Sequence, residues 1–154
     1  MLTDLEKNEI DKEISGCYVR QAGTIEALKA VQKMRGWVSD EAIRDIADYL
    51  DVSAEELENV ATFYNKIFRK PVGRHLIYVC DGIVCWIMNG ETVAQYLYKK
   101  LNIGPGETTA DGRFTVLPNT CLGACDRAPS AIIDDKLYSY LTTERLDDIL
   151  EKYE

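Results

Sequence analysis

The chain lacks any apolar run approaching the roughly 18 residues that a transmembrane helix needs. Its first residues, Met-Leu-Thr-Asp-Leu-Glu-Lys, have neither the basic start nor the apolar stretch of a signal peptide, and they are too acidic for a transit peptide. We therefore expect a cytoplasmic chain without direct membrane insertion, whose thiols stay reduced. Positive charge is also scarce, with 18 Lys and Arg against 26 Asp and Glu. The net charge of −8 argues against nucleic acid or an anionic membrane as the main partner.

The sequence has no internal repeat, no low-complexity segment and no G-x-G-x-x-G fingerprint. Nothing in it therefore predicts a nucleotide site of its own. What remains is the composition of a globular protein, because 46% of the residues are hydrophobic and 29% are charged. A length of 154 residues suffices for one ordinary domain or two small ones.

The first part of the chain, residues 1–71, has the pattern of a helical bundle. Apolar residues recur at helical spacing over residues 23–35, and Gly36 is placed to end that helix. Ser39 is placed to cap a second helix. A further short helix is expected over residues 2–14.

The third helix of this part is expected to begin after Ser53. Ser53 and Glu56 fit the capping box S-x-x-E, in which each side chain bonds the other residue's backbone N–H. The residues expected to face inward from this helix are Leu57, Val60, Ala61 and Tyr64.

A different pattern follows the break at Pro71-Val72-Gly73, and residues 72–154 form the second predicted domain. Strands are expected at 74–79 and 113–117, with a hairpin of 131–134 and 137–140 around Asp135-Lys136. Helices are expected over about 91–101 and from Thr142 onward, where Leu141 and Leu146 can form a hydrophobic staple. The order is β-α-β-β-β-α, so the chain as a whole is predicted to be α+β.

Four of the five cysteines fall in two pairs. Cys80 and Cys85 are spaced C-x4-C, and Cys121 and Cys125 are spaced C-x3-C. We expect both pairs to lie in loops after the first and second strands, where a rigid scaffold usually presents ligands. Four thiolates from two loops can hold a metal or an iron–sulfur cluster.

Several chemistries compete for these cysteines. Buried cysteine is often mere packing, but two tight pairs after strands are hard to explain in that way. Structural zinc tolerates these spacings without favouring them. Disulfides suit secreted proteins, and a thioredoxin-type redox pair would need C-x-x-C. A Rieske centre needs two histidines, and His75 is the only one.

A [2Fe–2S] cluster fits best, since it takes four cysteines and C-x4-C spacing occurs there. Gly82 and Gly123 leave room for backbone to approach the sulfur atoms. The neighbours expected to keep water from the cluster are Val84, Trp86, Leu122 and Ala124.

The motifs around the cysteines resemble those of a known protein family. Val79-Cys80-x4-Cys85-Trp86, followed by Cys121-Leu122-Gly123-Ala124-Cys125-x-x-Ala128-Pro129, is similar to the thioredoxin-like [2Fe–2S] ferredoxin family, as is the intervening segment 106–115. Gly36-Trp37-Val38 and Val60-Ala61-Thr62-Phe63-Tyr64 resemble one branch, the E subunit of bacterial NADH:quinone oxidoreductase, respiratory complex I.

The resemblance implies a four-helix N-terminal part and a thioredoxin-like domain in which Cys80, Cys85, Cys121 and Cys125 ligate one [2Fe–2S] cluster. It further implies an electron-transfer subunit of an oxidoreductase, without a catalytic residue or a complete active site of its own. The implied partner is the flavin-bearing F subunit, which binds NADH and FMN and whose flavin would exchange single electrons with the cluster. Location on the peripheral arm of a membrane-bound complex, beside further arm subunits, is also implied.

Some alternatives remain open at this level. The equivalent diaphorase subunit of an NAD-linked hydrogenase or formate dehydrogenase would show similar motifs, and a zinc-stabilised binding module would need no redox role. A free ferredoxin carrier is disfavoured because it would not need the helical part. Pro129 is predicted to be a cis-proline before a strand, as is frequent in thioredoxin-like folds. Cys17 is expected to be a packing or surface residue and His75 a strand residue.

Overall fold

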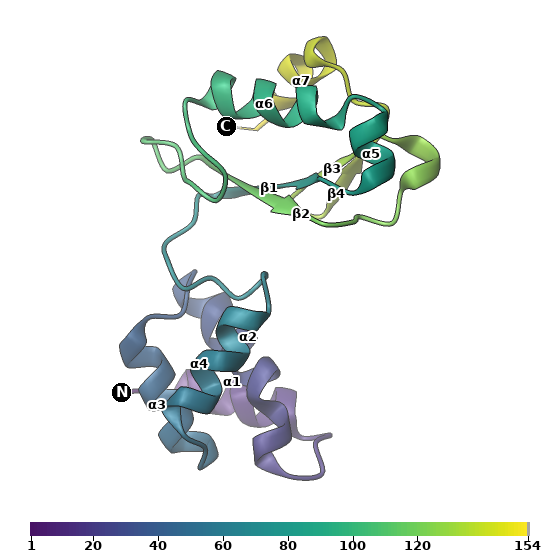
Figure 1. Ribbon diagram of the computed structural model, residues 1–154. Coiled ribbons are helices and arrows are strands. Elements are labelled where there is room, and N and C mark those ends of the chain that lie inside the picture. Colours follow the sequence, from purple (N-terminus) through teal and green to yellow (C-terminus); the bar gives the residue numbers. More distant parts are fainter. Residues whose placement is uncertain (154) are drawn as a thin grey trace. The chain divides into compact units, whose positions relative to one another are not determined.

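The computed structural model describes residues 1–153, and the chain divides into two compact units, Met1–Pro71 and Val72–Glu154. Figure 1 shows the first unit to be helical and the second to contain the sheet. The helices of the first unit are α1 (Asp4–Ile14), α2 (Thr24–Arg35), α3 (Asp40–Leu50) and α4 (Ala54–Phe63), with the 3-10 turn η1 (Arg20–Gly23) before α2. All the helices predicted for this part are present.

Local hydrogen bonds explain where these helices begin. The Ser39 hydroxyl accepts from the Ala42 N–H at 3.2 Å and the Ser53 hydroxyl from the Glu56 N–H at 3.1 Å, so both predicted caps are confirmed. The capping box at Ser53 differs from the prediction, because the Glu56 carboxylate accepts from the Ser53 hydroxyl instead of its backbone N–H. A complete capping box occurs at Thr3 and Glu6, which the sequence analysis did not single out although residues 3–6 have the T-x-x-E spacing.

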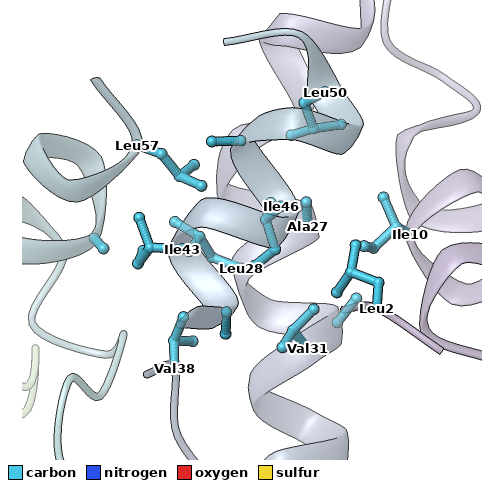
Figure 2. Packing of buried hydrophobic residues seen from close by; sticks show 14 of the residues in the cluster. Leu2, Ile10, Ala27, Leu28, Val31, Val38, Ile43, Ile46, Leu50 and Leu57 are labelled. Atoms are coloured by element: carbon cyan, nitrogen blue, oxygen red, sulfur yellow. The ribbon is translucent and has the colours of Figure 1, made fainter. Parts of the chain in front are cut away.

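The four helices bury a shared apolar core. Figure 2 shows its side chains meeting between the helices, and the largest fully buried members are Ile10, Leu28, Ile46, Leu50 and Leu57. Leu57 and Ala61 face inward from α4 as predicted, and Val60 packs at the edge of the core. The prediction for Tyr64 was wrong. It follows the last residue of α4 with an extended backbone and is 42% exposed, because the helix ends before its stripe reaches this position.

An ion pair with a buried carboxylate links α1 to α2. The Arg35 side chain donates to the Glu6 carboxylate, with its Nη2 atom 2.8 Å from Oε2, and the Thr3 N–H donates to the same oxygen at 2.8 Å. Glu6 is only 4% exposed. The bonds from Arg35 and Thr3 outweigh the cost of burial and lower the pKa of Glu6 from 4.5 to about 2.

We expect Glu6→Gln to lower the free energy of unfolding by about 2 kcal/mol at pH 7, because it weakens hydrogen bonds to a charged group. The pKa of Glu6 is depressed in the folded chain, so its carboxylate stabilises the fold above pH 4.5 and loses this effect as the pH falls toward about 2. Denaturant unfolding followed by circular dichroism should show the gap between variant and wild type closing over that range. Glu9→Gln is the matched control, since Glu9 pairs with Lys33 across the same helices at the surface. Equal effects of the two changes would contradict the role given to Glu6.

The second unit combines a sheet with three helices. Its elements are β1 (His75–Cys80), α5 (Ile83–Ile87), α6 (Gly90–Leu101), β2 (Phe114–Asn119), the 3-10 turn η2 (Cys125–Arg127), β3 (Ala131–Ile133), β4 (Lys136–Tyr138) and α7 (Thr143–Leu150). The sheet order is β2-β1-β3-β4. β1 and β2 are parallel, and β3 is antiparallel to both β1 and β4.

Parallel pairing of β1 and β2 requires a crossover, and α6 provides it. Figure 1 shows α6 and α7 on the same side of the sheet. Alternate strand residues point to that side, as the two-residue period of a strand requires. The core they form with the two helices contains Ile77, Val79, Val93, Leu97, Phe114, Val116, Ala131, Ile133, Leu146, Ile149 and Leu150.

The predicted α+β class and the β-α-β-β-β-α order are therefore confirmed, with one helix added. That helix, α5, has only five residues and too short a stripe to be read from periodicity. The hairpin turn lies at Asp134-Asp135, one residue earlier than predicted, because Asp134 takes a left-handed conformation with φ of 53°. The Leu141 and Leu146 pair is buried around the Thr142 cap as predicted. Among the described residues 1–153, none of the helices is both long enough and apolar enough to cross a membrane.

Candidate metal centre

The four paired cysteines lie at one end of the sheet. Cys80 is the last residue of β1, and Cys121 follows β2 by two residues. Cys125 begins the turn η2. The expectation that both pairs occupy loops was wrong for Cys80, which ends strand β1, and for Cys85, which lies on helix α5. The short helix turns the Cys85 side chain back into the protein, where it is 1% exposed.

The register of the parallel strands brings the two pairs together. Cys80 is opposite Asn119 in the ladder, and the Asp81 N–H donates to the Asn119 carbonyl at 3.0 Å. Since carboxyl ends of parallel strands meet at one edge, segments that are far apart in sequence leave β1 and β2 side by side. Residues 80–85 and 121–125 therefore share one site.

The sulfur atoms are arranged as two pairs. Among the other cysteines, Cys85 has the largest effect on the pKa of Cys80 and Cys121 the largest on that of Cys125, and each raises it. The charges of Cys80 and Cys85 also act on Cys125. Within residues 1–153, no three His, Cys, Asp or Glu side chains are close enough together to hold one metal ion.

This paired arrangement bears on the choice between zinc and an iron–sulfur cluster. Tetrahedral zinc with Zn–S bonds near 2.3 Å would draw four sulfur atoms to within about 3.8 Å of one another. A [2Fe–2S] cluster has two irons, each taking two of the four protein ligands, so it needs two separate pairs. The two cysteine pairs of the sequence match that ligand pattern.

Without a cluster, Cys80 and Cys125 are harder to ionise than an ordinary thiol, because the pKa of each is raised. Burial, followed by the hydrogen bond with Cys85, raises the pKa of the Cys80 thiol. The hydrogen bond with Cys121 and the charge of that neighbour raise the pKa of Cys125. A bound metal reverses this balance, because a coordinating thiol is deprotonated outright.

Backbone N–H groups already point at the sulfur atoms. The Gly123 N–H donates to Cys121 Sγ, with the two atoms 3.3 Å apart. The N–H groups of Gly82 and Leu122 donate to the Cys80 sulfur and oppose the rise in its pKa. Such donors offset negative charge on cluster ligands. The donor set and its surroundings therefore fit the four-cysteine cluster.

The two glycines act in different ways. A Cβ atom on Gly82 would lie 2.6 Å from the Thr120 carbonyl oxygen, so glycine is needed for the close approach of the two cysteine segments. A Cβ on Gly123 would meet nothing within 4 Å, and glycine is favoured there by a φ of +74°. The predicted role of close backbone approach thus applies to Gly82, whereas Gly123 provides a left-handed turn.

The two cysteine pairs differ in exposure. Cys80 and Cys85 are buried and pack with Ala128 and Leu122, while Cys121 and Cys125 are exposed. The Ala128–Pro129 peptide bond is cis, as predicted. It leads into Ser130, whose hydroxyl oxygen lies 3.8 Å from Cys85 Sγ. Sequence reasoning missed Ser130, because only the fold places it beside Cys85, 45 residues away.

The outer face of α5 is apolar and exposed. We call it the α5 surface, and it consists of Ile83, Val84, Trp86, Ile87 and Met88. Val84 and Trp86 were expected to shield the site, but they are 38% and 56% exposed, because the helix turns them away from Cys85. Leu122 is partly buried and packs against Cys80 and Cys85, as expected, and Ala124 is buried.

A hollow of about 380 Å³ adjoins the α5 surface, and Met88, Pro129 and Tyr140 are among its lining residues. The Trp86 indole N–H donates to the Glu91 carboxylate at 3.1 Å, which orients the ring against the start of α6. The apolar surface and the hollow are therefore continuous with the loops that carry the cysteines.

The remaining candidates lie apart from these loops. Cys17 is partly buried against the core of the helical unit, as expected of a packing cysteine. His75 opens β1, where its Nδ1 lies 2.9 Å from the Asp134 carboxylate. All five cysteines are free, so none is used for a disulfide.

A parallel strand pair with a helical crossover, an antiparallel hairpin and a cis-proline beside paired cysteines define a thioredoxin-like cluster-binding domain. The family model described as thioredoxin-like [2Fe-2S] ferredoxin matches residues 10–154, and the chain belongs to that family. Within the family it falls in the branch formed by the E subunits of NADH-quinone oxidoreductase.

That placement follows from two similar relatives. The chain is 50% identical over 152 residues to the NADH-quinone oxidoreductase E subunit of Escherichia coli strain K12, with 99% of this chain and 92% of that protein covered. It is 48% identical over 153 residues to the protein of the same name from Pseudomonas aeruginosa PAO1, with 99% and 92% covered.

A solved structure extends the comparison. The air-oxidised NAD+-reducing [NiFe]-hydrogenase is similar, with a TM-score of 0.69 and 28% identity over 81% of this chain. The chain spans only 22% of that hydrogenase chain. The likeness supports the fold.

Proposed function

We propose that this chain holds one [2Fe–2S] cluster on Cys80, Cys85, Cys121 and Cys125 and exchanges single electrons with the FMN of a partner flavoprotein subunit. The complex would be an NADH:quinone oxidoreductase, with the chain on its peripheral arm beside further arm subunits. The observation that carries the proposal is the pairing of four thiols at the shared edge of β1 and β2, with backbone N–H groups donating to Cys80 and Cys121.

When bound, the cluster would supply a one-electron couple. A flavin that has taken two electrons from a hydride donor could then pass them on one at a time. The residues of this chain would bind the cluster and keep water away from part of it. The Gly82, Leu122 and Gly123 N–H groups offset ligand charge. The buried Cys80 and Cys85 keep one side of the site away from water, while the exposed Cys121 and Cys125 lie on its open side.

The α5 surface is the proposed contact for the flavoprotein. Five neighbouring exposed apolar side chains beside a redox site indicate a protein interface in a monomer of this size. Electron exchange requires the partner's cofactor to come close to the cluster, and the α5 surface directly flanks the ligand Cys85. In the similar hydrogenase, this fold is one segment of a longer chain, consistent with a domain that works beside others.

The main rival is the equivalent diaphorase subunit of an NAD-linked hydrogenase or formate dehydrogenase. The hydrogenase likeness favours it in fold, at 28% identity. The E-subunit relatives are up to 50% identical over nearly the whole chain, and this higher identity favours the oxidoreductase. Identification of the subunits that co-purify with the chain separates these two functions.

We expect the purified full-length chain to be red-brown, to contain two irons and two acid-labile sulfides, and to give a [2Fe–2S] electron paramagnetic resonance (EPR) signal after reduction with dithionite. These are the composition and spin properties of the proposed cluster. A colourless preparation with one zinc per chain and no such signal would replace the proposal with a structural zinc module.

A further inference from the structure

Ser130 is a buried polar residue that the proposed ligand set does not use. It is 2% exposed, and its hydroxyl oxygen lies 3.8 Å from Cys85 Sγ. Cys85 itself is 1% exposed. A hydroxyl at this depth cannot turn to bulk water, and buried polar groups almost always have a hydrogen-bond partner. The Cys85 sulfur is the partner that the structure provides.

The backbone holds Ser130 firmly in this place. Its carbonyl accepts from the Cys80 N–H at 3.2 Å, next to the ladder between β1 and β3. The preceding Pro129 carbonyl accepts from the Leu141 N–H at 3.1 Å. The hydroxyl is therefore fixed to the same strand end that supplies the ligand Cys80.

Which atom donates the hydrogen bond between Ser130 and Cys85 depends on the protonation state of the sulfur. In the free thiol either atom can donate. A coordinating cysteine is a thiolate with no proton to give, so the serine O–H must be the donor. In a water-poor, low-dielectric site such a bond is electrostatically stronger than in water.

We propose that the Ser130 hydroxyl donates a hydrogen bond to the Cys85 thiolate and thereby raises the reduction potential of the cluster. Reduction adds one electron to the cluster and increases the negative charge on its sulfur ligands. A donor to one of those sulfurs stabilises the reduced form more than the oxidised form. Ser130 is thus a positioning and tuning residue, and the inference rests on the proposed function.

The test is an EPR-monitored redox titration of the full-length, cluster-loaded chain. We expect Ser130→Ala to lower the ratio of reduced to oxidised cluster at a fixed solution potential by about tenfold, which is about 59 mV for a one-electron couple. Ser130→Thr keeps a hydroxyl and should retain the wild-type potential. Ser130→Gly also lacks the hydroxyl and should shift the potential in the same direction. It tests the role of the hydroxyl if the alanine variant loses its cluster.

Thr115→Val is the matched control. Thr115 is another buried hydroxyl of the same unit, 1% exposed, and it accepts from the Gly73 N–H at 2.6 Å. Thr115 is opposite Leu76 in the ladder between β1 and β2, and Leu76 lies four residues before Cys80 in the chain. We expect its removal to lower stability without moving the potential.

The possible results distinguish a failure of the Ser130 proposal from a failure of the proposed function. A wild-type potential in both Ser130→Ala and Ser130→Gly, with full cluster content, would overturn the role of Ser130 and leave the cluster intact. A wild-type chain without any [2Fe–2S] signal would instead refute the proposed function. A shift of equal size in Thr115→Val would show that loss of packing, rather than the hydrogen bond, moves the potential.

Discussion

Cys121→Ala is expected to abolish the [2Fe–2S] EPR signal of the reduced chain while both units keep their fold. Cys121 is exposed and packs in neither apolar core, so its truncation leaves no buried cavity. What it removes is one of the four proposed thiolate ligands and the sulfur that accepts from the Gly123 N–H. The measurements are EPR after dithionite reduction, iron and sulfide content, and circular dichroism.

Cys17→Ala serves as the control for this prediction. Cys17 packs in the helical unit, outside the segments that carry the two pairs. The variant should retain the full cluster signal. A full-strength signal in Cys121→Ala would remove Cys121 from the ligand set, and a lost signal in Cys17→Ala would show that the assay reports general damage.

Ile87→Glu is expected to weaken binding of the flavoprotein subunit by about 100-fold or more, because truncating or charging a buried apolar anchor typically costs about 3 kcal/mol. Ile87 is 66% exposed in the isolated chain and belongs to the α5 surface. The change leaves the core of the unit intact, so the cluster signal should persist. Calorimetric titration of the cluster-loaded chain with the purified flavoprotein subunit measures the effect.

The matched control for this interface is Leu137→Glu. Leu137 is also an exposed apolar residue of the second unit, but it lies on the edge strand β4, outside the α5 surface. Its change should leave the affinity within a few-fold of wild type. Wild-type affinity in Ile87→Glu would mean that the flavoprotein binds elsewhere, and the proposed contact would have to be abandoned.

Local signals made much of the fold predictable. Ser39 and Ser53 cap helices because a short hydroxyl side chain can reach the free N–H groups of the first turn. The β-rich run before Cys80 and the turn residues around Asp134 mark strands by composition and period alone. Such features depend on neighbours a few residues away, which are visible directly in the sequence.

Exposure was less predictable than secondary structure. Tyr64 continues the apolar stripe of α4 but lies beyond the helix end, and Trp86 looked like a shield although α5 presents it outward. In both cases the side chain's direction depends on where a short helix ends or turns. One residue of difference rotates a side chain by about 100°, so the periodic pattern alone does not specify its environment.

By itself the sequence determined the chemistry available to this protein. Two cysteine pairs and the motifs around them predict a thiolate-bound centre, and a lone histidine is too few for a Rieske centre. Only the tertiary structure decided how those thiols are arranged. The parallel register of β1 and β2 sets the pairs side by side, α5 buries Cys85, and the cis-proline loop brings Ser130 to its sulfur. Contacts between residues 35 or more positions apart arise from strand pairing and packing, and no local pattern in the chain encodes them.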